Sequence, residues 1–285
     1  MKLIESKVEL IEQQPGLEGM YKQIELAGRT CYKSEDKITE DSAKEFVDRM
    51  IKLGHGAMLE HGTVYLKMDV NYGSLVYLEL EQKYTRNRYS RVDFEGGVMY
   101  VTTNLRVLVE NDWLDDLQYI CEPTEYHEKR ITARFTCDRG VSHEIVRHRV
   151  MSFAQESTRY CNYGKDKFGN EVTFIEPTWY STVTDEQREA FDDFLSISEE
   201  SYMALLDKWE NRTPDKRYKT RFKGNPLTPQ QARQVLPNAL KTEIVVTGFE
   251  SDWKHFFKLR TAGAAHPDMR KLAVELKELM YGKEV

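Results

Sequence analysis

The stretch ITARFTCDRGVSHEIVRHRVM (131–151) decides the class of fold. Its first seven residues, 131–137, read as a β-strand rich in β-branched and aromatic side chains. The residues that follow, 139–151, read as a helical segment. A strand that runs directly into a helix indicates a fold that mixes both elements.

The rest of the chain repeats this mixture. Strands are expected in the first 14 residues, over 62–70 and over 241–249, and helices over 17–31, 41–53, 184–212, from 228 onward, over 252–260 and over 269–280. A helix is also expected near 113–121, and 215–226 is expected to be a basic loop. Helix starts are predicted from their caps: Thr39 or nearby acids, Thr228 with Pro229 and Gln231, and Ser251. The pattern therefore predicts an α+β fold.

Composition excludes several classes of protein. The 285 residues are 40% hydrophobic and 31% charged, which is typical of a folded globular chain. No apolar run approaches the length of about 20 residues that a membrane span needs, and the N-terminus does not resemble a signal peptide, so a cytoplasmic protein is expected. Four scattered cysteines with no CxxC pair argue against a disulfide framework or a cysteine-rich zinc site. A net charge of −6 disfavours nucleic acid as a partner, so any anion must be held by a local group of arginines.

Such a group occurs in RHRVMSFAQESTRY (147–160), which contains Arg147, Arg149 and Arg159. Guanidinium groups that lie close together repel each other unless an anion neutralises them, and arginine suits bidentate phosphate binding. The alternative is an ordinary solvated basic helix face.

The spacing Arg147-His148-Arg149, seven residues, then Ser157 resembles the signature of the flavin-dependent thymidylate synthases. Four further blocks resemble the same family: LAGRTCY (26–32), GHGAMLEH (54–61), ARQVLPN (232–238) and FFKLR (256–260). The resemblance covers most of the chain except about 70–130 and part of 163–225.

The resemblance implies a single domain over 1–285, with an insertion around 70–130 and with helices around a central antiparallel sheet. It implies a homotetramer whose active sites combine more than one subunit. The implied reaction is the reductive methylation of dUMP to dTMP, with methylenetetrahydrofolate as carbon donor and FAD reduced by NADPH or NADH. The partners would be these small molecules, and no nucleic acid, membrane or metal is expected.

Family site residues carry over to matching positions. The expected dUMP contacts are Glu144, Arg147, Gln155, Glu156, Ser157, Thr158, Arg159, Arg233 and Arg260. The expected FAD contacts are His55, Glu60, Arg147, His148, Arg149, Gln155, His255 and His266. Arg260 is the expected catalytic residue, because its charge facing the pyrimidine would lower the pKa of ring atom N3.

The chain departs from the family pattern at several positions. Glu144 stands where the family often has Gln, and Ala57, Phe249 and His255 replace side chains that typically contact FAD. The late family histidine falls at Ala264, with His266 two residues further on. These departures leave open a catalytically impaired, nucleotide-binding homologue.

Three alternatives concern single residues. Ser157 could be a nucleophile activated by His148 or a structural hydroxyl rather than a dUMP ligand. HEIVRH (143–148) nearly matches the zinc motif HExxH, but its second histidine comes one residue late, so the two would not share a helix face. His55 and His61 could be ordinary capping or core residues beside glycine turns.

Overall fold

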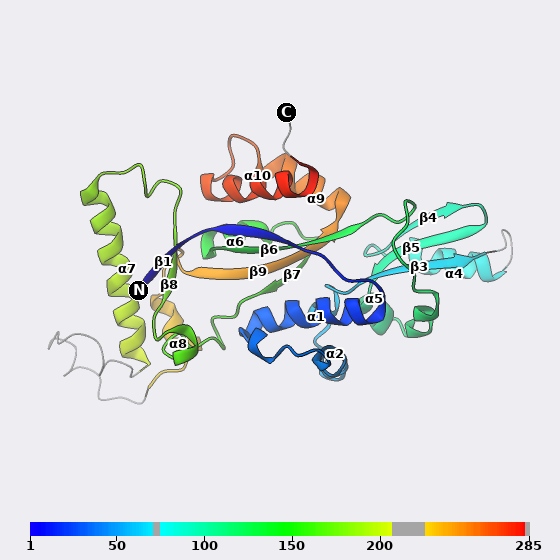
Figure 1. Cartoon of the computed structure of the whole chain (residues 1–285), viewed down its shortest axis with the longest axis horizontal. Coiled ribbons are helices and arrows are strands. Elements are labelled where there is room, and N and C mark those ends of the chain that lie inside the picture. The colour runs from blue at the N-terminus through cyan, green and yellow to red at the C-terminus, as the bar shows by residue number, and fades with distance from the viewer. Residues whose placement is uncertain (71–74, 207–225, 283–285) are drawn as a thin grey trace.

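The computed structural model describes residues 1–70, 75–206 and 226–282, and of residues 75–78 only the backbone. A four-stranded antiparallel sheet lies at the centre (Figure 1). In order across this sheet, its strands are β2 (Lys7–Ile11), β6 (Arg130–Asp138), β9 (Lys241–Phe249) and β7 (Ser152–Gln155). The predicted α+β class and the central antiparallel sheet are confirmed.

Helices cover both faces of this sheet (Figure 1). On one face lie α6 (Arg139–Ile145), α9 (Glu250–Arg260) and α10 (Pro267–Tyr281), and on the other lies α1 (Gly16–Tyr32). Because side chains alternate along a strand, Phe135 and Ile244 enter the first core, whereas Val245 packs with Ala27 of α1.

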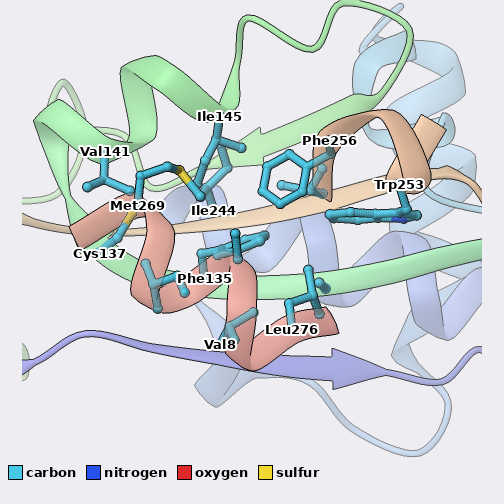
Figure 2. Close-up of a cluster of buried hydrophobic side chains, with 14 of the residues drawn as sticks. Val8, Phe135, Cys137, Val141, Ile145, Ile244, Trp253, Phe256, Met269 and Leu276 are labelled. Carbon is cyan, nitrogen blue, oxygen red and sulfur yellow. The ribbon is translucent and has the colours of Figure 1, made fainter. Parts of the chain in front are cut away.

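Aromatic packing in the first core positions α6 and α9 (Figure 2). Trp253 and Phe256 of α9 are fully buried, and the Trp253 indole donates to the Ile131 carbonyl at 3.0 Å. Val141 and Ile145 bury one side of α6 in the same core. The ends of these two short helices, where the candidate site lies, are therefore fixed relative to each other.

Two further sheets flank the centre. The first, in the order β3 (Thr63–Asp69), β5 (Val98–Asn104) and β4 (Arg91–Glu95), has its own hydrophobic core. Around it lie α2 (Ser42–Lys52), α3 (Gly56–Leu59), α4 (Leu75–Thr85), α5 (Leu105–Glu110) and the 3-10 helix η2 (Leu114–Tyr119).

The second flanking sheet pairs β1 (Lys2–Glu5) with β8 (Thr173–Glu176) in parallel, near α7 (Asp185–Leu205) and α8 (Pro229–Ala232). Three more 3-10 helices are η1 (Glu35–Lys37), η3 (Asp166–Phe168) and η5 (Arg233–Val235).

Most predicted elements are confirmed within a few residues, and the predicted capping box of Thr228 and Gln231 forms. The expected first strand is two strands, β1 and β2, which join different sheets. The single domain and the insertion around 70–130 stay predictions. The end of the predicted helix 184–212 and most of the basic loop 215–226 lie outside the described residues.

One predicted helix cap is wrong, and a second is confirmed in position only. The helix α9 begins at Glu250 with Phe249 as its N-cap, and the Ser251 amide donates to Glu128 Oε1 at 3.0 Å instead. The helix α2 has Asp41 as its N-cap, with no side-chain capping bond from Asp41 or Thr39. No described helix is both long and apolar enough to cross a bilayer.

Candidate active site

The end of α6 carries the signature histidine and arginines. Asp138 caps this helix by accepting the Val141 amide at 2.8 Å. The helix ends at Ile145, earlier than the predicted 151, because the chain must turn to begin β7 at Ser152. Arg147 and Arg149 lie in this turn, with exposed side chains that form no ion pair within the described part of the chain.

Arg260, the last residue of α9, reaches across to this turn. Its Nη1 donates to Glu144 Oε2 at 2.5 Å and its Nη2 donates to the Glu144 carbonyl at 3.0 Å. Its Nε donates to His148 Nε2 at 3.1 Å. Burial, followed by the charges of Arg260 and His255, lowers the pKa of His148 to about 4, so His148 is a neutral acceptor at physiological pH. The structure thus brings together three predicted site residues, which we call the Arg260 group: Glu144, His148 and Arg260.

Two other predicted residues border the Arg260 group. His255 is exposed on α9, and its ring lies 6.2 Å from that of His148. His266 is the N-cap residue of α10 and lines a cavity of about 290 Å³ together with Glu144. Asp138 and Asp268 also line this cavity, and its apolar wall includes Trp179.

The second cluster of predicted residues follows β7. Arg233 Nη1 donates to Thr158 Oγ1 at 3.0 Å, and Arg159 Nε donates to Gln230 Oε1 at 3.0 Å. The Ser157 amide donates to the Cys31 carbonyl at 2.9 Å, which ties this loop to the end of α1. We call Ser157, Thr158, Arg159 and Arg233 the Arg233 group.

Ser157 lacks the contact that a nucleophilic serine needs. Its Oγ accepts the Arg159 amide at 3.3 Å, and no histidine of the described chain hydrogen-bonds to it. His148, the base that the sequence offered, is bound to Arg260 instead. The geometry favours a binding or structural hydroxyl over a nucleophile.

Gln155 and Glu156 are directed into the protein. Gln155 Nε2 donates to Ser142 Oγ at 2.9 Å and to Thr242 Oγ1 at 3.2 Å, which joins α6 to β9. Glu156 is buried and accepts from Lys241 Nζ at 2.9 Å and from the Tyr163 hydroxyl at 3.0 Å. The Glu156 carboxylate therefore forms an internal ion pair, and its dUMP contact stays a prediction.

A charged network that was not predicted from the sequence lies beside the Arg233 group, and it joins Glu156, Lys241, Glu243 and Lys33. Lys241 also bonds to Glu243 at 2.6 Å, and Glu243 pairs with Lys33 at 2.9 Å. Burial alone would raise the pKa of Glu243, but the Lys241 and Lys33 charges outweigh burial and lower it to about 2. No sequence motif signals this network, because its members are separated by up to about 200 residues.

Among the described residues, no hydrogen bond or ion pair joins the GHGAMLEH block (54–61) to the Arg260 group or to the Arg233 group. His55 is exposed at the N-cap of α3, and Glu60 pairs with Arg106 at 2.5 Å. His61 is fully buried, with Nδ1 2.8 Å from Thr247 Oγ1, which supports the core interpretation of this histidine. Arg106 was not anticipated from the sequence. It lies on α5, in the segment interpreted as an insertion.

Metal ligation has no geometric support in the described ranges, where no three His, Cys, Asp or Glu side chains are grouped to hold an ion. Of the two histidines in HEIVRH, His143 is exposed and His148 is bonded to Arg260.

Comparisons with known proteins address the whole chain. The flavin-dependent thymidylate synthase of Geobacter sulfurreducens is 24% identical over 282 residues, which is 97% of this chain and 82% of that protein. The protein of the same name from Corynebacterium glutamicum is 25% identical over 275 residues, with coverages of 93% and 77%. Among solved structures, the UMP/dUMP methylase PolB from Streptomyces cacaoi bound with 5-Br dUMP aligns with 16% identity and a TM-score of 0.43, over 98% of this chain and 92% of that one.

A family model described as thymidylate synthase complementing protein matches residues 124–283, which is more than half of the chain. This range contains the Arg260 group, the Arg233 group and the signature arginines. The chain therefore belongs to the thymidylate synthase complementing protein family, the flavin-dependent thymidylate synthases.

Proposed function

We propose that this protein is a flavin-dependent thymidylate synthase that methylates dUMP to dTMP. The observation that carries the proposal is the arrangement of arginines. Arg260 and Arg233 come from separate elements, and each hydrogen-bonds to a residue of the stretch 147–160. This arrangement supplies one cationic place for a phosphate and another for a pyrimidine ring.

The Arg233 group fits the phosphate of dUMP. Arg159 lies on a loop and Arg233 at a helix end, and the Ser157 and Thr158 hydroxyls directly precede Arg159 in sequence. Charge-assisted bonds from guanidinium to phosphate are strong and geometrically specific. Lys241 and Glu156 beneath the loop would keep it in place without touching the nucleotide.

The Arg260 group fits the pyrimidine ring. A guanidinium held rigidly by Glu144 and His148 would favour the anionic form of the ring, in which C5 is the nucleophile. Neutral His148 adds no opposing positive charge, and it orients Arg260 by accepting its Nε–H.

The residues present also fit FAD. The guanidiniums of Arg147 and Arg149 are exposed, form no ion pair with the described residues, and suit its pyrophosphate. His55 and His255 are exposed and available for ring or ribose contacts. Bound FAD would supply the redox chemistry, with NADPH as the reductant and methylenetetrahydrofolate as the carbon donor. A flavin contact by Glu60 requires it to exchange its bond to Arg106.

The family resemblance implies a homotetramer in which one active site combines the two groups. No hydrogen bond or ion pair within the described residues joins the Arg260 group to the Arg233 group, although one nucleotide must contact both. Packing of subunits would bring the Arg260 group of one copy to the Arg233 group of another.

The decisive experiment combines a spectrum with product analysis. Purified protein, reconstituted with FAD if needed, should show a flavin absorbance band that bleaches with NADPH faster in the presence of dUMP. Adding methylenetetrahydrofolate should then yield dTMP. Protein that binds dUMP but cannot hold FAD would instead support the impaired homologue, and protein that binds neither would overturn the proposal.

A further inference from the structure

We propose that Glu144 is the base that receives the N3 proton of the uracil ring during turnover. This inference rests on the proposed function and extends it, because it assigns a proton-transfer role to a carboxylate where the family often has an amide. It starts from the contacts of Arg260.

The Arg260 guanidinium is already paired before any substrate arrives. Three of its five N–H groups are used by Glu144 Oε2, the Glu144 carbonyl and His148 Nε2. Two N–H groups of Arg260 and one carboxylate oxygen of Glu144, Oε1, have no hydrogen-bond partner among the described residues. The Arg260 side chain is 18% exposed and the Glu144 side chain is 31% exposed, so both are partly accessible to solvent.

The unused N–H groups of Arg260 are donors, and the unused Oε1 of Glu144 is an acceptor. The uracil edge has the complementary pattern, since O4 accepts and N3–H donates. An Arg260 N–H pointing to O4 and a Glu144 oxygen pointing to N3–H would satisfy both partners. Arg260 alone offers donors only and would leave the N3 proton without an acceptor.

The proton transfer balances within the pair. The N3–H bond breaks, its electrons stay on N3 and spread to O2 and O4, which makes the ring and its C5 more electron-rich, and the proton forms an O–H bond with Glu144. The Arg260 charge, no longer opposed by a carboxylate, then faces the ring anion. After C5 has been methylated, the proton returns from Glu144 to N3, so no additional reactant is consumed.

Glu144 shares its cavity with other titratable side chains. Across the shared cavity lie Asp138 and Asp268, whose negative charges oppose that of Glu144, and exposed His266. Arg260 provides the counteracting attraction. His148 cannot serve as the base through Nε2, because this nitrogen already accepts the Arg260 Nε–H.

The test compares Glu144→Gln with Glu144→Asp in the FAD-loaded full-length enzyme. Gln retains an acceptor for Arg260 but cannot take a proton, whereas Asp can. At neutral pH and saturating dUMP, Glu144→Gln should lower kcat by about 10²–10⁴-fold, with a much smaller change in KM. Its rate should then rise steeply with pH, because the N3 proton must leave to solvent. Glu144→Asp should recover part of kcat and the flatter wild-type pH profile.

A binding measurement without turnover provides the second readout. The N3 ionisation of bound 5-fluoro-dUMP can be followed by ultraviolet difference spectra. Its midpoint should lie at higher pH in the wild type and Glu144→Asp than in Glu144→Gln, because a carboxylate beside N3 opposes the ring anion and a neutral amide does not. Glu18→Gln, an exposed substitution in the first turn of α1, is the matched control and should behave as the wild type in both assays.

The outcomes separate this inference from the proposed function. An active wild type with an equally active Glu144→Gln variant, unchanged in pH profile and in the 5-fluoro-dUMP titration, overturns the role of Glu144 alone. A wild type that forms no dTMP counts against the proposed function, and the titration of bound 5-fluoro-dUMP still tests Glu144.

Discussion

At the scale of single residues, the site depends on a few charge-assisted hydrogen bonds that join distant parts of the sequence. Arg233 to Thr158 and Arg260 to Glu144 each connect residues more than 70 positions apart. Because such bonds are directional, replacing one arginine should affect one part of the nucleotide and leave the other part unchanged.

Arg233→Ala should weaken dUMP binding by about 10–100-fold, because a hydrogen bond from a charged group contributes about 1.5–3 kcal/mol. Calorimetric titration with dUMP measures this loss. Deoxyuridine, which lacks the phosphate, should bind the variant and the wild type equally. An equal loss for both ligands would show that Arg233 does not contact the phosphate.

His61 should make stability depend on pH. Burial, reinforced by the Arg130 charge, lowers the pKa of His61 from 6.5 to about 3, so the folded protein holds it neutral. The unfolded chain takes up the proton below about pH 6.5, so stability is full above this pH and falls as the pH drops toward 3. In His61→Gln, the decline in the free energy of unfolding between pH 6.5 and 4.5 should be shallower by up to about 1.4 kcal/mol per pH unit.

Urea unfolding at several pH values measures this slope. His143→Gln replaces an exposed histidine and is the control, whose slope should match that of the wild type. If the free energy of unfolding falls with pH equally steeply in the wild type and in His61→Gln, His61 is not held neutral in the folded protein.

At the scale of elements, β9 organises the site because it lies between β6 and β7 and runs into α9. Its first residues join the charged network below the Arg233 group, and the helix that follows it ends at Arg260. This role follows from the order of strands in the sheet, which a single strand pattern does not reveal.

Lys241→Met should lower the free energy of unfolding by about 3–5 kcal/mol, because it leaves the buried Glu156 carboxylate without its cation. Chemical denaturation measures the change. Lys254→Met removes a similar lysine–glutamate pair on the surface of α9 and should leave stability nearly unchanged. Equal effects of the two substitutions would show that the network does not stabilise the loop.

Sequence reasoning predicted the elements whose signals are local. The capping box of Thr228 and Gln231 and the strand 241–249 were both found as expected. It placed the end of α6 too late, since nothing within 139–151 signals that β7 must begin at Ser152. The inward direction of Glu156 was equally hidden, because its partner Lys241 lies 85 residues away.

At the scale of the whole molecule, the proposed tetramer would combine the Arg260 group of one copy with the Arg233 group of another at one nucleotide. This arrangement predicts complementation between inactive variants. Arg233→Ala and Arg260→Ala should each have little activity alone. After mixed refolding at equal amounts, about a quarter of the sites should combine two intact groups, so activity should recover toward a quarter of the wild type.

Sedimentation of the mixture verifies that mixed assemblies formed. Mixed assemblies without recovered activity would mean that each site belongs to a single chain. Recovery without any assembly larger than a monomer would contradict the proposed sharing.

The alternation along β9 has a consequence for how this region can vary. Val246 packs toward α9 and α10, whereas Val245 packs toward α1. Inserting or deleting one residue at this point would turn every later side chain to the opposite face and displace α9. Alignments of relatives should therefore show replacements but no gaps between Lys241 and Arg260, and length variation should be confined to the loops outside this span.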